Sequence, residues 1–310
     1  IAKQPRQEAK YIMLLTDELI ARTFTEENID LANLHYLIEC LIAFHKYYET
    51  LYLRRINPVE ITSAISRELK GVRISEVFQL YGSEKINKII DALQALLIEN
   101  ASGITSTQMR NIYDRMVLEP NYYRLKELKP VLAYTAARQA KPESIKLIFL
   151  LMELLKKVKS EKERIQYLKV FEAIVSLHKF EEAVQNRNIN PQKLNEEIDA
   201  HFKDFSDESL LNMRREKHTY SKIQEALQSF VLPDKNRDGL KASQFRRLFD
   251  ETGTTKTADD IRLLRPLFLY TAARQSNPGA QRLILFFVKL MKEMTNDQAD
   301  GFKHLMSDLL

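Results

Sequence analysis

The stretch LKPVLAYTAARQAKP (residues 128–142) returns 136 residues later as LRPLFLYTAARQSNP (residues 264–278). The same offset holds without a gap from position 103 to beyond position 147, and 15 of the 47 positions from 103 to 149 are identical. Self-similarity at a fixed offset is typical of a structural unit that is used more than once. The sequence therefore predicts a protein built from copies of one fold.

The repeat extends in both directions from this stretch. INP at 56–58 recurs at 189–191, ALQ at 92–94 recurs at 226–228, and YLIECLIAFHKYYE at 36–49 matches KVFEAIVSLHKFEE at 169–182. These matches predict three parts. Residues 1–54 are the C-terminal half of a first repeat, residues 55–188 are a complete repeat, and residues 189–310 are a repeat lacking its C-terminal tail.

The composition and the spacing of apolar residues indicate helices throughout. The 310 residues include only 7 Gly and 9 Pro, too few for a β-sandwich, a barrel or a Gly-rich nucleotide-binding fold. In IKLIFLLMELLK (145–156) apolar residues recur at helical spacing. The same pattern is present at 61–69, 86–98, 107–117, 125–139, 163–180 and 193–202. We predict an all-α fold of tandem helical bundles, with about five to six helices in each unit.

Several classes of protein are excluded by what the sequence lacks. Cys40 is the only cysteine, which excludes a disulfide scaffold and a cysteine-based zinc site and indicates a reducing, cytoplasmic location. The longest apolar runs, such as LIECLIAF (37–44), are far shorter than a membrane span. We find no catalytic motif and no cofactor motif. The prediction is a protein that is not an enzyme and has neither a cofactor nor a membrane partner.

The stretch DKNRDG (234–239) begins like an EF-hand calcium-binding loop. The twelfth position of that loop needs a bidentate Glu and here holds Phe245. A solvated turn between helices is the favoured interpretation. The six His residues show no metal-ligand spacing, so no metal site is predicted.

Positive charge is concentrated in the repeated stretches. Residues 108–146 hold eight Lys or Arg against four Asp or Glu, and residues 244–282 hold seven against four, although the whole chain is only +5. A surface that binds a polyanion requires such a concentration. The net charge of ordinary solvated helix faces also varies by a few units. Composition therefore leaves open whether these stretches bind a polyanion or are plain solvated surface.

The first segment that could carry function is ITSTQMRNIYDRM (104–116). Thr105, three residues before Gln108, predicts a capping box at a helix start. Arg110 and Asp114 are one turn apart, as are Arg246 and Asp250 in the copy. These arginines either form plain surface ion pairs or present guanidinium groups to phosphates near a helix N-terminus.

The second segment is LKPVLAYTAARQ (128–139) with its copy. Pro130 should kink the helix or mark its first turn. Tyr134 and Arg138 are four residues apart on one face, beside small alanines that let a neighbour approach. This arrangement suits contacts with bases and ribose phosphates. The alternative, a core tyrosine and an arginine paired with a carboxylate, stays open.

Taken in order, these segments resemble the small helical subunit of type III-A CRISPR effector complexes. The family pattern begins with a Thr/Ser–x–Gln–x–Arg–x–x–Tyr-like helix, here TSTQMRNIY (105–113). A helix like LKPVLAYTAARQ follows, then an amphipathic helix, and then an ending like VFEAIVSLHKF (170–180). Family members are single units, whereas this sequence holds fused copies.

The resemblance implies a helical bundle that stacks along the complex and contacts the backbone of the guide RNA–target RNA duplex without cutting it. The implied partners are guide RNA, target RNA and the other CRISPR effector backbone and signature subunits. The predicted RNA-binding residues are Arg110, Lys129, Tyr134, Arg138, Arg246, Arg265, Tyr270 and Arg274. The alternative hypothesis is an all-helical repeat scaffold that binds only protein partners.

Overall fold

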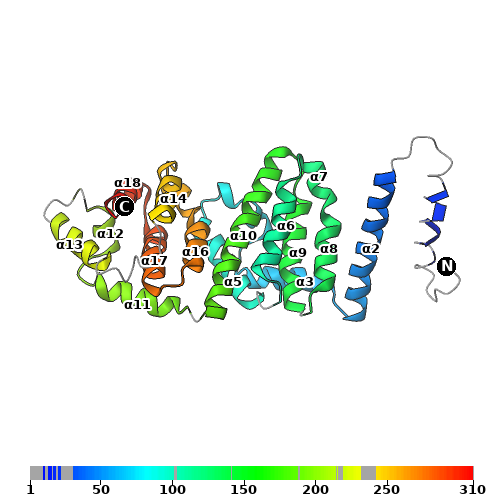
Figure 1. Cartoon of the computed structure of the whole chain (residues 1–310), viewed down its shortest axis with the longest axis horizontal. Coiled ribbons are helices and arrows are strands. Elements are labelled where there is room, and N and C mark those ends of the chain that lie inside the picture. Colours follow the sequence, from blue (N-terminus) through cyan, green and yellow to red (C-terminus); the bar gives the residue numbers. More distant parts are fainter. Residues whose placement is uncertain are drawn as a thin grey trace.

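The chain is all-α, as its composition and periodicity predict. A computed structural model describes residues 10, 13–15, 17–18, 20–21, 31–100, 103–140, 142–187, 189–213, 215, 219–231 and 242–309. Within these residues the backbone forms α-helices and two short 3-10 helices, with no strand (Figure 1). We call residues 55–188 the central region and residues 189–309 the C-terminal region.

The central region is preceded by α2 (Leu31–Leu53) and ends in the longest helix of the described chain. Its elements are α3 (Pro58–Glu68), α4 (Ile74–Phe78), η1 (Leu80–Gly82), α5 (Ile86–Asn100), α6 (Ser106–Val117), α7 (Tyr122–Glu127), α8 (Lys129–Arg138), α9 (Pro142–Lys156) and α10 (Glu161–Arg187). Six of these α-helices have ten or more residues, which fits the predicted number. The short α4 and α7 were not anticipated.

The C-terminal region has a matching series of α-helices, with its 3-10 helix at a different place. Its elements are α11 (Pro191–His201), α12 (Asp207–Leu211), α13 (Tyr220–Val231), α14 (Ala242–Gly253), α15 (Ala258–Arg262), α16 (Arg265–Arg274), α17 (Pro278–Glu293), η2 (Asn296–Gln298) and α18 (Ala299–Asp308). Helices α3 and α11 both begin at the proline of INP, and the preceding Asn57 and Asn190 cap them by accepting from the backbone N–H of Val59 and of Lys193. The division of the chain into repeats stays a prediction, and these shared bounds support it.

A break at Leu128 corrects the single helix expected over 125–139. Leu128 has φ −79° and ψ 0°, and it separates α7 from α8. Pro130 lies in the first turn of α8, where its missing N–H costs no helical hydrogen bond. Of the two alternatives for Pro130, the first-turn position is therefore the observed one.

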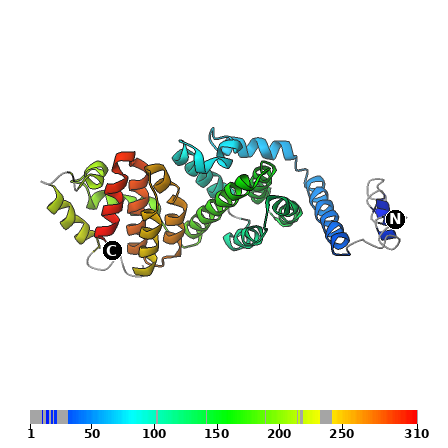
Figure 2. The same cartoon turned by 90° about the horizontal axis from the view of Figure 1, so that it is seen from above.

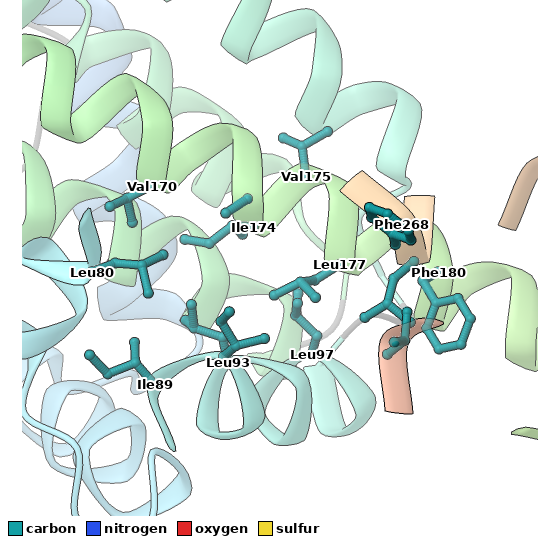
Figure 3. Packing of buried hydrophobic residues seen from close by; sticks show 14 of the residues in the cluster. Leu80, Ile89, Leu93, Leu97, Val170, Ile174, Val175, Leu177, Phe180 and Phe268 are labelled. Atoms are coloured by element: carbon teal, nitrogen blue, oxygen red, sulfur yellow. The ribbon is translucent and has the colours of Figure 1, made fainter. Parts of the chain in front are cut away.

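The core lies around α10. Its side chains Val170, Ile174 and Leu177 are almost fully buried. Ile174 and Leu177 point toward Leu93 and Leu97 of α5, and Val170 lies beside Leu80 (Figure 3). The chain continues along α10 to the C-terminal region, where Phe180 lies beside Phe268 of α16 (Figure 3). At about 1.5 Å per residue, α10 is about 40 Å long. It is therefore long enough to pack within the central region and also against the C-terminal region.

The helix before each region docks in the same way. α10 packs along α16, and α2 packs along α8. At one junction Arg187 Nη1 donates to the Ala273 carbonyl at 3.0 Å, and at the other Arg54 Nη1 donates to the Gln139 carbonyl. The molecule is consequently elongated, with α2 toward one end and α11, α12 and α13 toward the other (Figures 1 and 2).

Gly301 permits the close contact of α18 with α12, which gives a test of the packing. A Cβ atom at Gly301 would overlap the backbone carbonyl of Leu211, whereas one at Gly253 would meet open space. We expect Gly301→Ala to lower the free energy of unfolding by about 1–3 kcal/mol, since backbone must shift to admit the methyl group. Gly253→Ala is the matched control and should be neutral or stabilising by up to about 1 kcal/mol. Urea unfolding measures both, and an unchanged midpoint for Gly301→Ala would contradict the packing.

Candidate nucleic-acid interface

The N-terminus of α6 presents Arg110 in a fixed position. Thr105 and Gln108 form the predicted capping box, with the Thr105 hydroxyl accepting from the Gln108 N–H at 3.1 Å. Arg110 Nε donates to Asp114 Oδ1 at 2.9 Å, and its guanidinium lies 5.0 Å from the centre of the Tyr113 ring. The Arg110 side chain keeps 45% of its surface exposed. An exposed ion pair of this kind adds little stability, so Arg110 can exchange Asp114 for a phosphate at low cost.

Helix α14 repeats this arrangement. Arg246 Nε donates to Asp250 Oδ1, also at 2.9 Å, and its guanidinium lies 5.4 Å from the centre of the Phe249 ring. Both side chains of the ion pair are more than half exposed. The two arginines therefore have the same local geometry.

Helices α8 and α16 each hold a guanidinium close to a tyrosine ring. Arg138 lies 5.7 Å from the centre of the Tyr134 ring, and Arg274 lies 5.9 Å from that of Tyr270. Tyr134 is 41% exposed, and Tyr270 is half-buried. Neither tyrosine is a core residue. Each pair joins a cation to an accessible aromatic ring, and these are the groups that bind phosphates and stack on bases.

One junction brings residues of the two regions together. A cavity of about 140 Å³ is lined by Arg110, Asn111 and Val175 and also by Ser106, Thr107, Lys179 and Tyr270. Arg110 comes from α6, Lys179 from α10, and Tyr270 from α16 of the C-terminal region. We call this cavity the junction groove. It combines two cations, an aromatic ring and the N-terminal turn of α6, although its residues span more than 160 positions of sequence.

Arg265 lies elsewhere and is not accessible. Its side chain is fully buried, it donates to Asn87 and Gln94 at 3.2 and 2.9 Å, and it forms an ion pair with Asp91. Burial lowers the pKa of Arg265, and the Asp91 carboxylate counteracts that shift. In this structure Arg265 joins the two regions and cannot reach RNA, which corrects the expectation from the sequence.

Lys129, which the repeat aligns with Arg265, is half-buried. Its ammonium group lies 5.9 Å from the centre of the Phe44 ring of α2. Lys129 therefore belongs to the junction of α2 with α8 rather than to the surface that presents Tyr134 and Arg138. Both residues lie at the start of a helix that packs against an earlier part of the chain. Arg265 faces α5, and Lys129 faces α2.

A second basic surface lies outside the residues predicted from the sequence. A cavity of about 900 Å³ at the junction of α9 and α10 is lined by four lysines, Lys156, Lys157, Lys159 and Lys162, together with Tyr81, Glu153 and Glu163. The charge run KKVKSEK (156–162) was the available signal. The corresponding segment of the C-terminal region, KEMTNDQ (292–298), lacks most of these cations, so the surface is specific to the central region.

Other chemistry is not indicated by the described part of the chain. No group of three or more His, Cys, Asp or Glu side chains in it could hold a metal ion. The EF-hand-like stretch 234–239 lies outside the described residues. None of the helices described is long and apolar enough to cross a membrane.

Comparison with known families adds one finding. Residues 82–183 match the family Csm2 Type III-A. The match covers α5 to α10 and thus contains α6, α8 and most of the junction groove, but it spans only about a third of the chain. No curated protein and no solved structure matches the chain.

Polar side chains of α10 hold the start of α6, the helix whose first residues line the junction groove. His178 is fully buried, and its Nε2–H donates to the carbonyl of Ile104, directly before α6, at 2.8 Å. Burial alone would raise the pKa of Glu182, but hydrogen bonds from Ser106 and Lys179 outweigh it and lower that pKa. These contacts hold the first turn of α6 against α10.

The buried imidazole of His178 predicts a pH dependence of stability. Burial lowers the pKa of His178, so the unfolded chain takes up the proton more readily and stability falls as the pH drops below about 6.5, by up to about 1.4 kcal/mol per pH unit. His178→Gln should flatten this dependence between about pH 7 and 5. His45, the exposed counterpart in α2, provides the control, because His45→Gln should leave the dependence unchanged. Urea unfolding at several pH values measures the free energy of unfolding. If its slope against pH is the same in His178→Gln as in wild type, His178 is not the cause of the dependence.

Proposed function

We propose that the chain is a non-catalytic, RNA-binding structural subunit of a type III CRISPR RNA-guided effector complex. In this role it stacks along the guide RNA–target RNA duplex, contacts the RNA backbone, and binds the other effector backbone and signature subunits. The observation that carries the proposal is the junction groove, whose Arg110, Lys179 and Tyr270 converge at a helix N-terminus within and beside the segment that matches Csm2 Type III-A.

The chemistry of the groove suits an RNA backbone. Guanidinium and ammonium groups neutralise phosphates, and backbone N–H groups at a helix N-terminus add donors. In A-form RNA, phosphates and 2′-hydroxyls are accessible to such a surface while base edges are not read. Since the guide supplies sequence recognition by base pairing, the protein needs only regularly placed positive charge.

The repeated geometry supports binding at more than one place along the duplex. Arg110 and Arg246 have the same ion-pair distance to their carboxylates, and Arg138 and Arg274 lie at similar distances from their tyrosines. Fusion in one chain makes the second contact intramolecular, which raises its effective concentration. We therefore expect the four arginines to act together.

The alternative, a scaffold that binds only proteins, has support from one feature. Ile42, Tyr48 and other apolar side chains of α2 are exposed, and exposed apolar faces often bind protein partners. This alternative predicts that the four arginines can be replaced with no effect on RNA affinity.

The test replaces Arg110, Arg138, Arg246 and Arg274 together by Ala. We measure binding of the chain to a labelled guide–target RNA duplex by fluorescence anisotropy at several salt concentrations. If each arginine neutralises one phosphate, the slope of log K against log salt becomes shallower by about 0.9 per lost contact, or between 3 and 4 in total. Affinity at low salt should fall by at least about a hundredfold.

The control removes the same charge from a different surface. Arg67, Lys70, Arg73 and Lys88 are exposed cations of the central region outside the junction groove. Their quadruple Ala variant has the same net charge as the test variant and should keep most of the affinity and slope. Equal losses in the two variants would mean that net charge alone drives binding, and an unchanged slope in the test variant would favour the protein-only scaffold.

A further inference from the structure

The side of α10 opposite the junction groove carries a second cavity. This is the cavity of about 900 Å³ lined by α4, the end of α9 and the start of α10, and we call it the lysine cavity. Gln166 lines the lysine cavity, and Val175 lines the junction groove. These residues are nine positions apart, which is about two and a half turns of an α-helix, so their side chains leave α10 in opposite directions. A ligand in one cavity therefore leaves the other free.

Three ammonium groups of the lysine cavity are accessible to a ligand. Lys157 is half-buried, and Lys159 and Lys162 are exposed. None of the three side chains forms an ion pair or a hydrogen bond with another residue of the described chain. Lysine binds phosphate as a point charge, so these groups can neutralise phosphates without first breaking an existing contact.

The carboxylates of the lysine cavity are engaged with other groups. Glu153 forms an ion pair with Lys156 at 2.5 Å. Glu163 accepts hydrogen bonds from the backbone N–H of Lys159 at 2.7 Å and from the Ser160 hydroxyl at 3.1 Å, so it serves the start of α10. The lining holds four lysines against two carboxylates, and neither carboxylate is paired with the three accessible ammonium groups.

A further lysine extends the row of cations beyond the cavity. Lys162, Gln166 and Lys169 follow one face of α10, at spacings of four and three residues. Lys169 is exposed, and its Nζ lies 5.2 Å from the centre of the ring of Tyr81, which lines the cavity. The positive charge is therefore arranged as a row, which suits an extended ligand better than a compact one.

The C-terminal region folds without these lysines. KKVKSEK (156–162) contains four lysines and one glutamate, a net charge of +3, whereas the corresponding KEMTNDQ (292–298) contains one lysine, one glutamate and one aspartate, a net charge of −1. Both segments nevertheless connect one helix to the next, α9 to α10 and α17 to η2 and α18. The connection itself does not require the positive charge, so the charge points to a ligand.

The charge and the size of the cavity indicate the chemistry of that ligand. Exposed lysines attract most strongly a polymer with closely spaced phosphates, because each neutralised phosphate releases counterions. Ligand pockets in proteins measure about 300–1,000 Å³, so a cavity of about 900 Å³ admits a few nucleotides of one strand but not a duplex.

We propose that the lysine cavity binds single-stranded nucleic acid, with the phosphates of one strand lying along the three accessible lysines and Lys169. This site goes beyond the proposed function, since it takes a second ligand on the face of α10 opposite the junction groove. Contacts to phosphates carry no sequence information. Single-stranded RNA and DNA of any sequence should therefore bind alike.

The test measures binding of a labelled single strand to the full chain by fluorescence anisotropy at several salt concentrations. The probes are oligouridine and oligodeoxythymidine of about 12 nucleotides, within the usual site sizes of single-strand binding surfaces. An excess of unlabelled guide–target RNA duplex is present throughout, so that the junction groove is occupied. Both probes should bind, with affinities that differ by less than about threefold.

The test variant replaces Lys157, Lys159 and Lys162 together by Ala. Its affinity for either strand at low salt should fall at least about tenfold. The slope of log K against log salt should become shallower by about 0.7 for each lost contact, or by about 2 in total. Its affinity for the guide–target duplex should stay that of wild type, because the junction groove is unchanged.

The control variant replaces Lys193, Lys203 and Lys222, three exposed lysines of the C-terminal region, by Ala. It has the same net charge as the test variant and should bind both strands like wild type. The quadruple arginine variant, in which duplex binding is expected to fail, should also keep its single-strand binding. A failure of the proposed function therefore appears in duplex binding, and a failure of this proposal appears in single-strand binding.

Four results would each overturn the proposal. The first is a strand that does not bind while the duplex is present, and the second is an equal affinity of the test and control variants. The third is displacement of the strand by polyglutamate at a lower concentration than by unlabelled strand, which would assign the cavity to an acidic protein segment. The fourth is displacement by ATP at a lower concentration of phosphate groups than by unlabelled strand, which would assign it to a single nucleotide.

Discussion

The described structure depends on one interaction, the packing of α10 against the central region and the C-terminal region at the same time. Val170, Ile174 and Leu177 pack within the central region, and Phe180 lies against the C-terminal region. A helix that is apolar on more than one side must be enclosed by other helices. Since α10 is one uninterrupted helix, the position of one region fixes that of the other.

Small residues make this enclosure possible. Ala136 and Ala137 of α8, like Ala272 and Ala273 of α16, are buried and have no side chain beyond Cβ, so the preceding helix can approach closely. At each junction an arginine at the end of that preceding helix or directly after it, Arg187 or Arg54, then donates to a carbonyl at or near the end of the alanine-rich helix. The α2–α8 junction and the α10–α16 junction thus contain the same kind of hydrogen bond from an arginine to a backbone carbonyl.

This mode of packing places the candidate interface between regions instead of inside one. Arg110 and Lys179 become neighbours of Tyr270 only because α10 carries α16 to the N-terminus of α6. The same packing removes Arg265 from the surface and pairs it with Asp91. In a protein built from stacked repeats, a surface formed at a junction recurs wherever another repeat is added.

The sequence by itself determined the local structure. Helical periodicity, the Thr105–Gln108 capping box and the Arg110–Asp114 pair all depend on residues within one or two turns of each other, and the structure contains each of them. Only the tertiary structure decided which cations stay accessible. Lys129 and Arg265 occupy matching positions, yet Arg265 alone is fully buried, because its exposure depends on α5, more than 170 residues earlier in the chain. No local pattern records that contact, and for the same reason the meeting of Arg110 with Tyr270 could be found only in the folded chain.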